Sequence, residues 1–423
     1  MSLRQTAQPG TIPAVTTETR AVTYRSVLGQ REFRALLVSQ GLSILGDQLA
    51  RLALAVLVYR ATGSDFAAAA TYGVSFLAYL MGGPVLSSLA DRWSRRSIMV
   101  ASDLARAVLV LLLAVPNLPL AGVYALLVVL GLAAPAFDSA RSATLPDMLP
   151  GEAYPRGSAL FSLVHQGAQV LGFVAGGALL LVLSSRQVLL LDAVTFVLSA
   201  AALRVWVQRR PAQPATGFSL LKDTADGLRL VMGDPRLRSL LGVAVLSAAA
   251  VAAPESVAVP AAAELGGGSL ASGVLTASLP AGFLLASFLV LRVAAERRER
   301  LLVPLAALSA VPLLLSPLSG SVVVTVLLWA LSGAGSCVQL VASAAYVVAA
   351  PPEARGRAYG VASTSLMAVQ GLAQLVVGGL SGLAGPSVAV AVIAAGMLLV
   401  LPLVRGAGRP GGLKSQPEPP EAV

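Results

Sequence analysis

The sequence predicts an all-α membrane protein of about twelve transmembrane helices, arranged as two six-helix halves. Apolar residues make up 56% of the 423 residues and charged residues only 12%, whereas a water-soluble domain carries about 25% charged residues. Apolar stretches of about 20 residues, the length that crosses a hydrocarbon core of roughly 30 Å, recur from residue 33 to residue 406. Backbone groups in lipid must be hydrogen-bonded within their own segment, so these stretches are expected to be helices.

The expected helices follow one another with short polar loops between them. The first half is expected to occupy residues 33–207, with spans at 33–60, 65–90, 97–117, 119–145, 157–184 and 186–207. The second half is expected to occupy residues 238–406, with spans at 238–262, 269–294, 300–317, 320–350, 357–382 and 385–406. Residues 1–32 and 407–423 are expected to form polar tails, since the first 30 residues lack the basic start and apolar stretch of a signal peptide.

Residues 208–237 form the longest interruption and divide the two halves. Within them, residues 218–231 place several leucines among charged residues. This pattern predicts a short amphipathic helix on the inner face of the membrane, and an unstructured tether is the alternative.

The distribution of positive charge predicts the orientation. Of the 30 Lys and Arg residues, Arg60 and Arg186 fall in outer loops, and Arg51, Arg106 and Arg141 lie within spans. The others lie in the termini and in the loops that join even-numbered to odd-numbered spans, so the positive-inside rule places both termini in the cytoplasm of a multi-pass inner (plasma) membrane protein. The net charge of +10 therefore indicates topology and contact with anionic membrane lipids rather than a nucleic-acid partner.

The two halves resemble each other in sequence. When Pro150 is aligned with Pro351, the same offset brings Gln169 onto Gln370. In both halves a loop with proline, glutamate and arginine enters a helix that carries glutamine and glycine. A duplicated transporter predicts such a repeat, so the fifth and eleventh spans are interpreted as symmetry mates.

The loop between the second and third spans carries a recognisable motif. Residues 87–96 read Ser-Ser-Leu-Ala-Asp-Arg-Trp-Ser-Arg-Arg, and residues 103–106 continue with Asp-Leu-Ala-Arg. The loop resembles the signature of the major facilitator superfamily, G-x-L-a-D-r-x-G-r-r, with Ser87 and Ser94 where that pattern has glycine. The resemblance covers residues 30 to 406 and implies a major facilitator fold, for which a monomer is the usual expectation.

Other stretches resemble one branch of that superfamily, the drug:proton antiporters that include macrolide-efflux and enterobactin-exporter-like proteins. They are Gly46-Asp47, Phe137-Asp138-Ser139-Ala140-Arg141, Leu191-Asp192-Ala193-Val194-Thr195-Phe196, Asp234-Pro235-Arg236-Leu237-Arg238 and Arg355-Gly356-Arg357. One departure concerns the G-P-x-x-G-G motif that exporters often carry in the fifth span. Here Phe173 replaces the proline between Gly172 and Gly177, which keeps the closely packing glycines and weakens the motif as an argument for export.

Charged side chains within spans are the first candidates for function, because each costs at least about 2.5–3.5 kcal/mol at mid-bilayer. Asp47 and Arg51 are four residues apart and share a helical face. Asp47 is interpreted as a proton or cation site that Arg51 tunes, and a self-neutralising structural pair is the alternative. Asp103 and Arg106, three residues apart, are expected to form a structural pair.

The family resemblance implies a conformational latch at the cytoplasmic ends of the second, third and fourth spans. In that picture a charge network holds the outward-facing state, and Asp91 also meets the start of the eleventh span near Arg357. The expected members of the latch are Asp91, Arg92, Arg95, Asp138 and Arg141.

Glu255 and His165 are further candidates. Glu255 lies between Pro254 and Pro260, so its helix is expected to bend there, and its carboxylate could bind a cationic substrate or a proton or reach water at the outer mouth. His165 is the single histidine and could bond a neighbouring helix or carry a proton. Five glutamines could bind substrate or join helices: Gln166, Gln169, Gln339, Gln370 and Gln374.

Together these patterns predict a secondary active transporter that uses proton influx to expel a small amphipathic drug or a secreted metabolite. An importer of the same fold is one alternative, and a non-transporting membrane sensor is another. A membrane enzyme would need a loop with clustered His, Asp or Glu, and no loop offers one. No G-x-x-x-x-G-K-[ST] motif occurs, and neither a cofactor nor a metal is expected.

Overall fold

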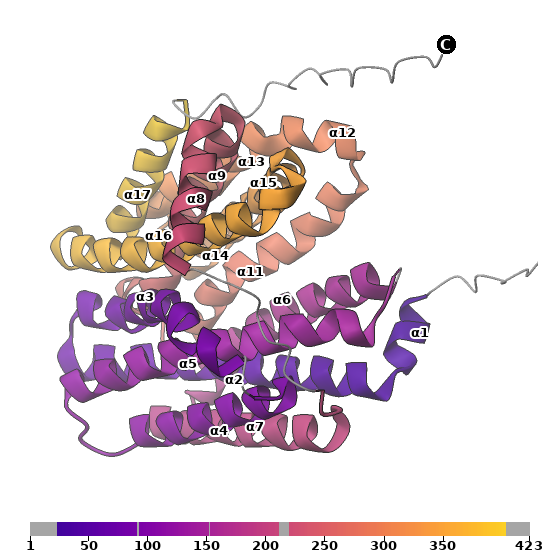
Figure 1. Cartoon of the computed structure of the whole chain (residues 1–423). Coiled ribbons are helices and arrows are strands. Elements are labelled where there is room, and N and C mark those ends of the chain that lie inside the picture. Colours follow the sequence, from indigo (N-terminus) through magenta and orange to yellow (C-terminus); the bar gives the residue numbers. More distant parts are fainter. Residues whose placement is uncertain (1–22, 91–92, 152, 211–219, 403–423) are drawn as a thin grey trace, which may run out of the picture.

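The computed structural model describes residues 23–90, 93–151, 153–210 and 220–402 and contains only helices within them. Figure 1 shows the first half, in indigo and magenta, below the second half, in orange and yellow. Nine helical segments of these residues are long and apolar enough to cross a membrane. Together with α3, α4 and the shorter apolar α17 they make the predicted two sets of six spans, so the all-α fold class is confirmed.

The first half is built from one long helix per span. After the short α1 (Tyr24–Gly29), its spans are α2 (Arg31–Thr62), α3 (Asp65–Ala90), α4 (Arg95–Leu113), α5 (Leu120–Met148), α6 (Ala153–Leu179) and α7 (Ser185–Trp206). Local sequence signals set several of these limits. Ser94 accepts a hydrogen bond from the Ser97 N–H at the start of α4, and Gly63 ends α2 with a positive φ of 63°.

Helix α8 (Leu220–Gly233) occupies part of the predicted linker, so this part is helical rather than an unstructured tether. It packs along the start of α16 (Arg355–Ala384), where Arg357 Nη1 lies 3.9 Å from Asp226 Oδ2. A side chain at Gly227 would come within 2.9 Å of the Arg357 carbonyl oxygen. The absence of a side chain at residue 227 therefore allows this close packing.

The second half contains two spans that are broken into shorter helices. Its helices are α9 (Pro235–Ser256), α10 (Ala258–Glu264), α11 (Ser269–Arg292), α12 (Ala295–Arg298), η1 (Glu299–Leu301), α13 (Leu302–Leu314), η2 (Ser316–Leu318), α14 (Val322–Gly335), α15 (Val338–Ala349), η3 (Pro352–Ala354), α16 and α17 (Pro386–Val400). The seventh span breaks at Val257, between Pro254 and Pro260, which confirms the bend predicted there. The break of the tenth span at Ser336 and Cys337 follows a glycine and was not predicted.

The two halves pack tightly together at one end of the bundle, which we name the closed end. There Ser381 of α16 donates a hydrogen bond to Asp65 of α3. Added Cβ atoms at Gly177 of α6 and Gly273 of α11 would each lie within 3.0 Å of the facing backbone. The opposite end, which holds Arg31, Arg95, Arg204, Arg355 and most other arginines of the helix termini, is named the basic end. The two halves therefore contact each other through closely approaching backbones at the closed end. Most of the arginines lie at the opposite end.

Candidate functional site

A cavity of about 390 Å³ lies mainly within the first half. Helices α2 to α7 supply most of its lining, and Met367 and Gln370 of α16 contribute from the second half. Its charged lining residues are Asp47, Arg51, Arg106, Asp138 and Asp192. Three of these five, Asp47, Arg51 and Asp138, are among the candidates that the sequence predicted, so the cavity collects residues whose charge is costly within the membrane.

Arg106 of α4 lies at the centre of the charged cluster. Its Nη2 is 2.5 Å from Asp103 Oδ1, and its Nη1 is 3.7 Å from Asp47 Oδ2 on α2. The guanidinium carbon lies 4.8 Å from the centre of the Phe137 ring and 4.5 Å from that of Phe196, so two aromatic faces also stabilise the cation. The predicted Asp103–Arg106 pair exists, but Arg106 also reaches the cavity and a second carboxylate.

Asp47 is paired with Arg106 rather than with Arg51. Its side chain is 31% exposed, so its carboxylate can contact a molecule or a proton donor in the cavity. The Arg51 guanidinium carbon lies 5.3 Å from the centre of the Phe76 ring, and no Asp47–Arg51 ion pair occurs among the described residues. The alternative of a self-neutralising pair on one helix is therefore wrong for this structure, because α4 supplies the cation instead.

The cluster continues into the fully buried interior of the first half. Ser199 Oγ of α7 donates a 2.5 Å hydrogen bond to Asp103 Oδ2 and also bonds the Ser39 hydroxyl on α2. Such a chain of hydrogen bonds holds the Asp103 carboxylate in one position. Three helices that are distant in sequence are therefore tied together by one acidic side chain.

Asp192 of α7 is the functional candidate that the sequence analysis did not single out. It is fully buried, accepts a 3.2 Å hydrogen bond from Thr195, and has one carboxyl oxygen without a hydrogen-bond partner. A Cβ at Gly46, next to Asp47, would lie 2.2 Å from the other oxygen. The motif around Asp192 was used only as a mark of family, although a carboxylate within a span is itself a functional signal.

The expected latch residues occupy two separate places. Asp138 lines the cavity, accepts a 2.9 Å hydrogen bond from the Tyr79 hydroxyl, and lies 3.6 Å from Arg141. Arg95 lies instead at the basic end, where it bonds Asp147 at 2.5 Å. Asp91 and Arg92 fall outside the described residues. The predicted convergence of Arg95 with Asp138 and Arg141 is thus replaced by a cavity pair and a terminal pair.

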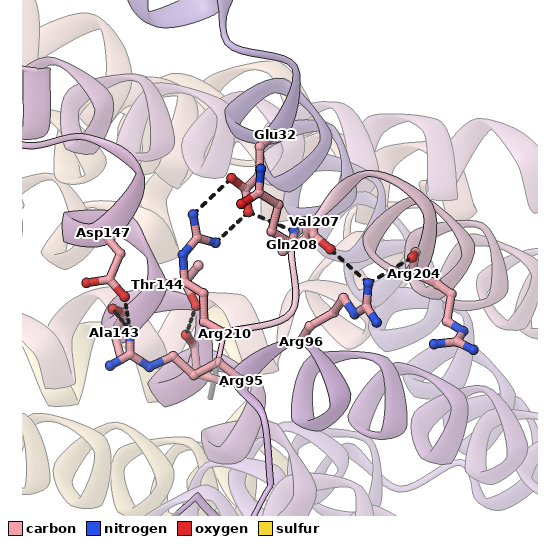
Figure 2. Close-up of polar contacts among 11 residues, drawn as sticks. Glu32, Arg95, Arg96, Ala143, Thr144, Asp147, Arg204, Val207, Gln208 and Arg210 are labelled. Atoms are coloured by element: carbon pink, nitrogen blue, oxygen red, sulfur yellow. Dashed lines mark hydrogen bonds and ion pairs between the residues drawn. The ribbon is translucent and has the colours of Figure 1, made fainter. Parts of the chain in front are cut away.

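Figure 2 shows polar contacts at the basic end of the first half. Arg210 donates two hydrogen bonds to the Glu32 carboxylate, at 2.5 and 3.0 Å, and the Gln208 N–H donates a third at 2.9 Å. Arg96 donates to the Val207 carbonyl at 3.2 Å. The hydrogen bond to Glu32 raises the pKa of the Arg210 guanidinium, since it favours the charged form. The start of α2 is therefore tied to the end of α7.

Glu255 and His165 differ in their surroundings. Glu255 is half-buried on α9, and Arg51 of the first half is the charged group that acts on it among the described residues. The sequence showed no cation near Glu255, because Arg51 approaches it only through the packing of the two halves. His165 is exposed and lines the cavity, which favours a cavity role over a bond between helices.

The candidate glutamines also separate into two groups. Gln169 of α6 and Gln370 of α16, the pair related by the internal repeat, both line the cavity. Gln374 is buried, and neither of its amide atoms has a partner among the described residues. Gln166 and Gln339 are half-buried and lie outside the cavity lining described here. Gln40 and Gln48 of α2, which the sequence analysis did not select, line the cavity as well.

Comparisons with known proteins agree with this architecture. The family model described as Major Facilitator Superfamily matches residues 36–259. The "Uncharacterized MFS-type transporter YfiS" of Bacillus subtilis (strain 168) is 31% identical over 178 residues, which cover 41% of this chain and only 42% of that relative.

Two solved structures show the same fold. A mutant of the peptide transporter POT superposes with a TM-score of 0.72 at 14% identity, over 91% of this chain and 98% of that chain. A bacterial homologue of the human lysosomal transporter Spinster, inward-facing and occupied, superposes with a TM-score of 0.70 at 15% identity, over 91% and 97% of the two chains.

Proposed function

The chain belongs to the Major Facilitator Superfamily and is a multi-pass membrane transporter of that type, and from this premise we propose that it expels a small amphipathic molecule in exchange for protons. The observation that carries the proposal is a cluster of three carboxyl groups, in which Asp47 and Asp103 pair with Arg106 and Asp192 lies beside Gly46, the neighbour of Asp47. Among the described residues, the cavity and its ion-pair partners hold four carboxyl groups (Asp47, Asp103, Asp138 and Asp192) against three guanidinium groups (Arg51, Arg106 and Arg141), so one carboxyl group is left to take up a proton or a cationic substrate. Such a site in a membrane is typical of a coupling site.

Asp47 is proposed as the carboxylate that binds a proton and a cationic substrate in turn. It is the exposed member of the cluster and shares Arg106 with the buried Asp103. A proton from water and a cationic substrate would each neutralise Asp47, so they exclude each other at this position. Asp138 and His165, which also line the cavity, are proposed to bind polar groups of the substrate, as are Gln169 and Gln370.

The direction of opening is proposed from the contrast between the two ends. The positive-inside rule places the basic end, with both chain termini, in the cytoplasm of the plasma membrane. The close backbone contact at Gly177 and Gly273 lies at the closed end, which this orientation places outside. The structure is then an inward-facing state, and rocking the two halves about this contact gives alternating access. A monomer suffices for this cycle.

The test is proton-driven uptake of a lipophilic fluorescent cation into inside-out vesicles, with wild type, Asp47→Asn and Glu255→Gln. Wild type is expected to accumulate the cation until an uncoupler is added, and Asp47→Asn is expected to lose at least about 90% of this uptake. Glu255→Gln is expected to retain more uptake, because Glu255 lies outside the three-carboxylate cluster.

Glu353→Gln is the matched control, since Glu353 is an exposed carboxylate in η3, directly before α16. Uptake by Asp47→Asn at the level of this control would refute the assignment of Asp47. Wild-type uptake that persists after the uncoupler would refute proton coupling. If no member of a panel of cations is taken up, the proposal of cation export fails.

A further inference from the structure

A second pocket of about 200 Å³ lies in the second half, next to the charged cavity. Helices α9, α15 and α16 line it, and Met367 lines both the pocket and the cavity. We propose that the transported molecule is a cationic amphiphile, with its charged head in the first-half cavity and its apolar tail across Met367 in the second-half pocket. This inference deepens the proposed function and rests on it for the claim of transport.

The two sites differ in chemistry. Around the cavity, Asp47 and Asp138 offer carboxylates that are 31% and 38% exposed. The aromatic side chains of Phe76 and Tyr79 lie in the same lining, and Arg51 already lies over the Phe76 ring, as expected where aromatic rings favour a cation. Acidic and aromatic groups in one cavity are the chemistry that recognises a cationic head. Arg106 and Arg51 attract an anionic head less than they would alone, because Arg106 is paired with Asp47 and Asp103 and Arg51 lies over the Phe76 ring.

The second-half pocket is apolar. Leu240, Leu241, Ala244, Val347 and Leu366 form much of its wall, and no charged residue lines it among the described residues. The hydroxyl of Tyr346, one of its few polar groups, already donates a 3.0 Å hydrogen bond to the Ala358 carbonyl. An apolar tail that displaces water there therefore leaves this hydroxyl paired.

The volume of the pocket limits the length of the tail. A pocket of about 200 Å³ holds about seven methylene-sized groups, at roughly 30 Å³ for each small group of this size. Affinity should therefore rise with chain length up to about an octyl chain and then level off. Partition into a bilayer, by contrast, increases with every added methylene.

The test is direct binding of alkyltrimethylammonium ions, from tetramethyl to dodecyl, to the full-length protein in lipid nanodiscs, measured by calorimetry. Wild type is expected to bind the octyl compound at least about tenfold more tightly than tetramethylammonium, since each buried methylene contributes up to about fourfold. The dodecyl compound should gain less than about threefold more. Octyl sulfate and octanol should bind at least about tenfold more weakly than the octyl cation.

Two variants fill the pocket from different helices. Ser363→Phe on α16 and Val347→Phe on α15 are expected to reduce the gain between the methyl and octyl compounds to less than about threefold, with little change in tetramethylammonium binding. The matched control is Thr364→Phe, since Thr364 is exposed on α16 and lines neither site among the described residues. It should retain the wild-type gain.

The outcomes separate this inference from the transport proposal, because binding needs neither flux nor a gradient. Binding with the predicted pattern in a protein that shows no proton-driven uptake would keep the two-site assignment and reject proton-coupled export. No dependence on tail length, an equal loss in Thr364→Phe, or no binding of any cation would overturn it. Equal binding of octanol would assign the pocket to membrane acyl chains and overturn the role of the charged head.

Discussion

The two halves share six-span architecture but differ in what their spans carry through the membrane. In the first half, seven charged residues lie in span interiors: Asp47, Arg51, Asp103, Arg106, Asp138, Arg141 and Asp192. In the described second half, the corresponding interior charge is Glu255. The first half is therefore held together in part by an ionic network, with the energetic risk that buried charges bring.

The second half is held together by close helix packing. Added Cβ atoms at Gly282 of α11 and Gly333 of α14 would lie 1.9 and 2.1 Å from facing carbonyl oxygens. These helices approach closely through small residues, as is typical in membranes. The comparison indicates that ion chemistry belongs to the first half, while the second half offers a rigid apolar wall.

The largest expected effect is the loss of the central cation of the first half. Arg106→Leu leaves Asp103 buried without its ion-pair partner, so the free energy of unfolding should fall by about 3–5 kcal/mol. Thermal unfolding of the purified protein measures this loss. Arg238→Leu is the second-half control, because Arg238 is at the start of α9 and bonds only the Met232 carbonyl among the contacts described. An equal fall in melting temperature for Arg106→Leu and Arg238→Leu would contradict the proposed difference between the two halves.

The next effect should fall on the second half. Gly282→Ala places a methyl group against the Ala330 carbonyl oxygen, and overpacking of this kind costs about 1–3 kcal/mol. Gly46→Ala in the first half meets the side chains of Asp192 and Thr195, which can rotate. We expect Gly46→Ala to lower the melting temperature less than Gly282→Ala does. We expect it to reduce proton-driven uptake more. Gly396→Ala, with open space at its Cβ position, should be neutral or slightly stabilising.

An effect of similar size distinguishes two buried serines. Ser199→Ala removes the hydrogen bond that Asp103 accepts, and a bond to a charged group contributes about 1.5–3 kcal/mol. Ser247 of α9 is also fully buried, but its hydroxyl has no partner among the described residues. Ser247→Ala should therefore be neutral or stabilising in the same melting assay. A larger loss of stability in Ser247→Ala than in Ser199→Ala would show that buried polar hydrogen bonds do not distinguish the two halves.

The smallest effect concerns the ion pairs of the basic end. Arg210→Ala breaks the two-bond pair with Glu32 and should cost about 1 kcal/mol, less at high salt. Arg236→Ala breaks the single 2.9 Å pair with Glu299 in the second half and should cost less. Because the pKa of Arg210 is raised, its contribution is present below the unfolded-state pKa and is lost only as pH rises through the folded-state value. Unfolding measured up to about pH 9 should show no loss from this group.

The sequence predicted the spans and the bend near Val257, because hydropathy and proline act locally. It also predicted that Gln169 and Gln370 are related, and both line the cavity. It did not reveal that Arg106 pairs with Asp47 or that Ser199 bonds Asp103, because these contacts join helices that only tertiary packing brings together. Asp192 was missed for the same reason, since its importance depends on what surrounds it.

Helix α4 carries Arg95, Arg96, Asp103 and Arg106 and is not among the helices apolar enough to span a membrane by composition alone. A newly made α4 would therefore enter the bilayer poorly by itself. Its carboxylate is bonded by Ser199 and its guanidinium is stacked against Phe196, and both partners belong to α7, which is synthesised later. Asp47 of α2 and Phe137 of α5 can hold Arg106 earlier, so we expect α4 to become fully stable as a span once α7 adds Ser199 and Phe196.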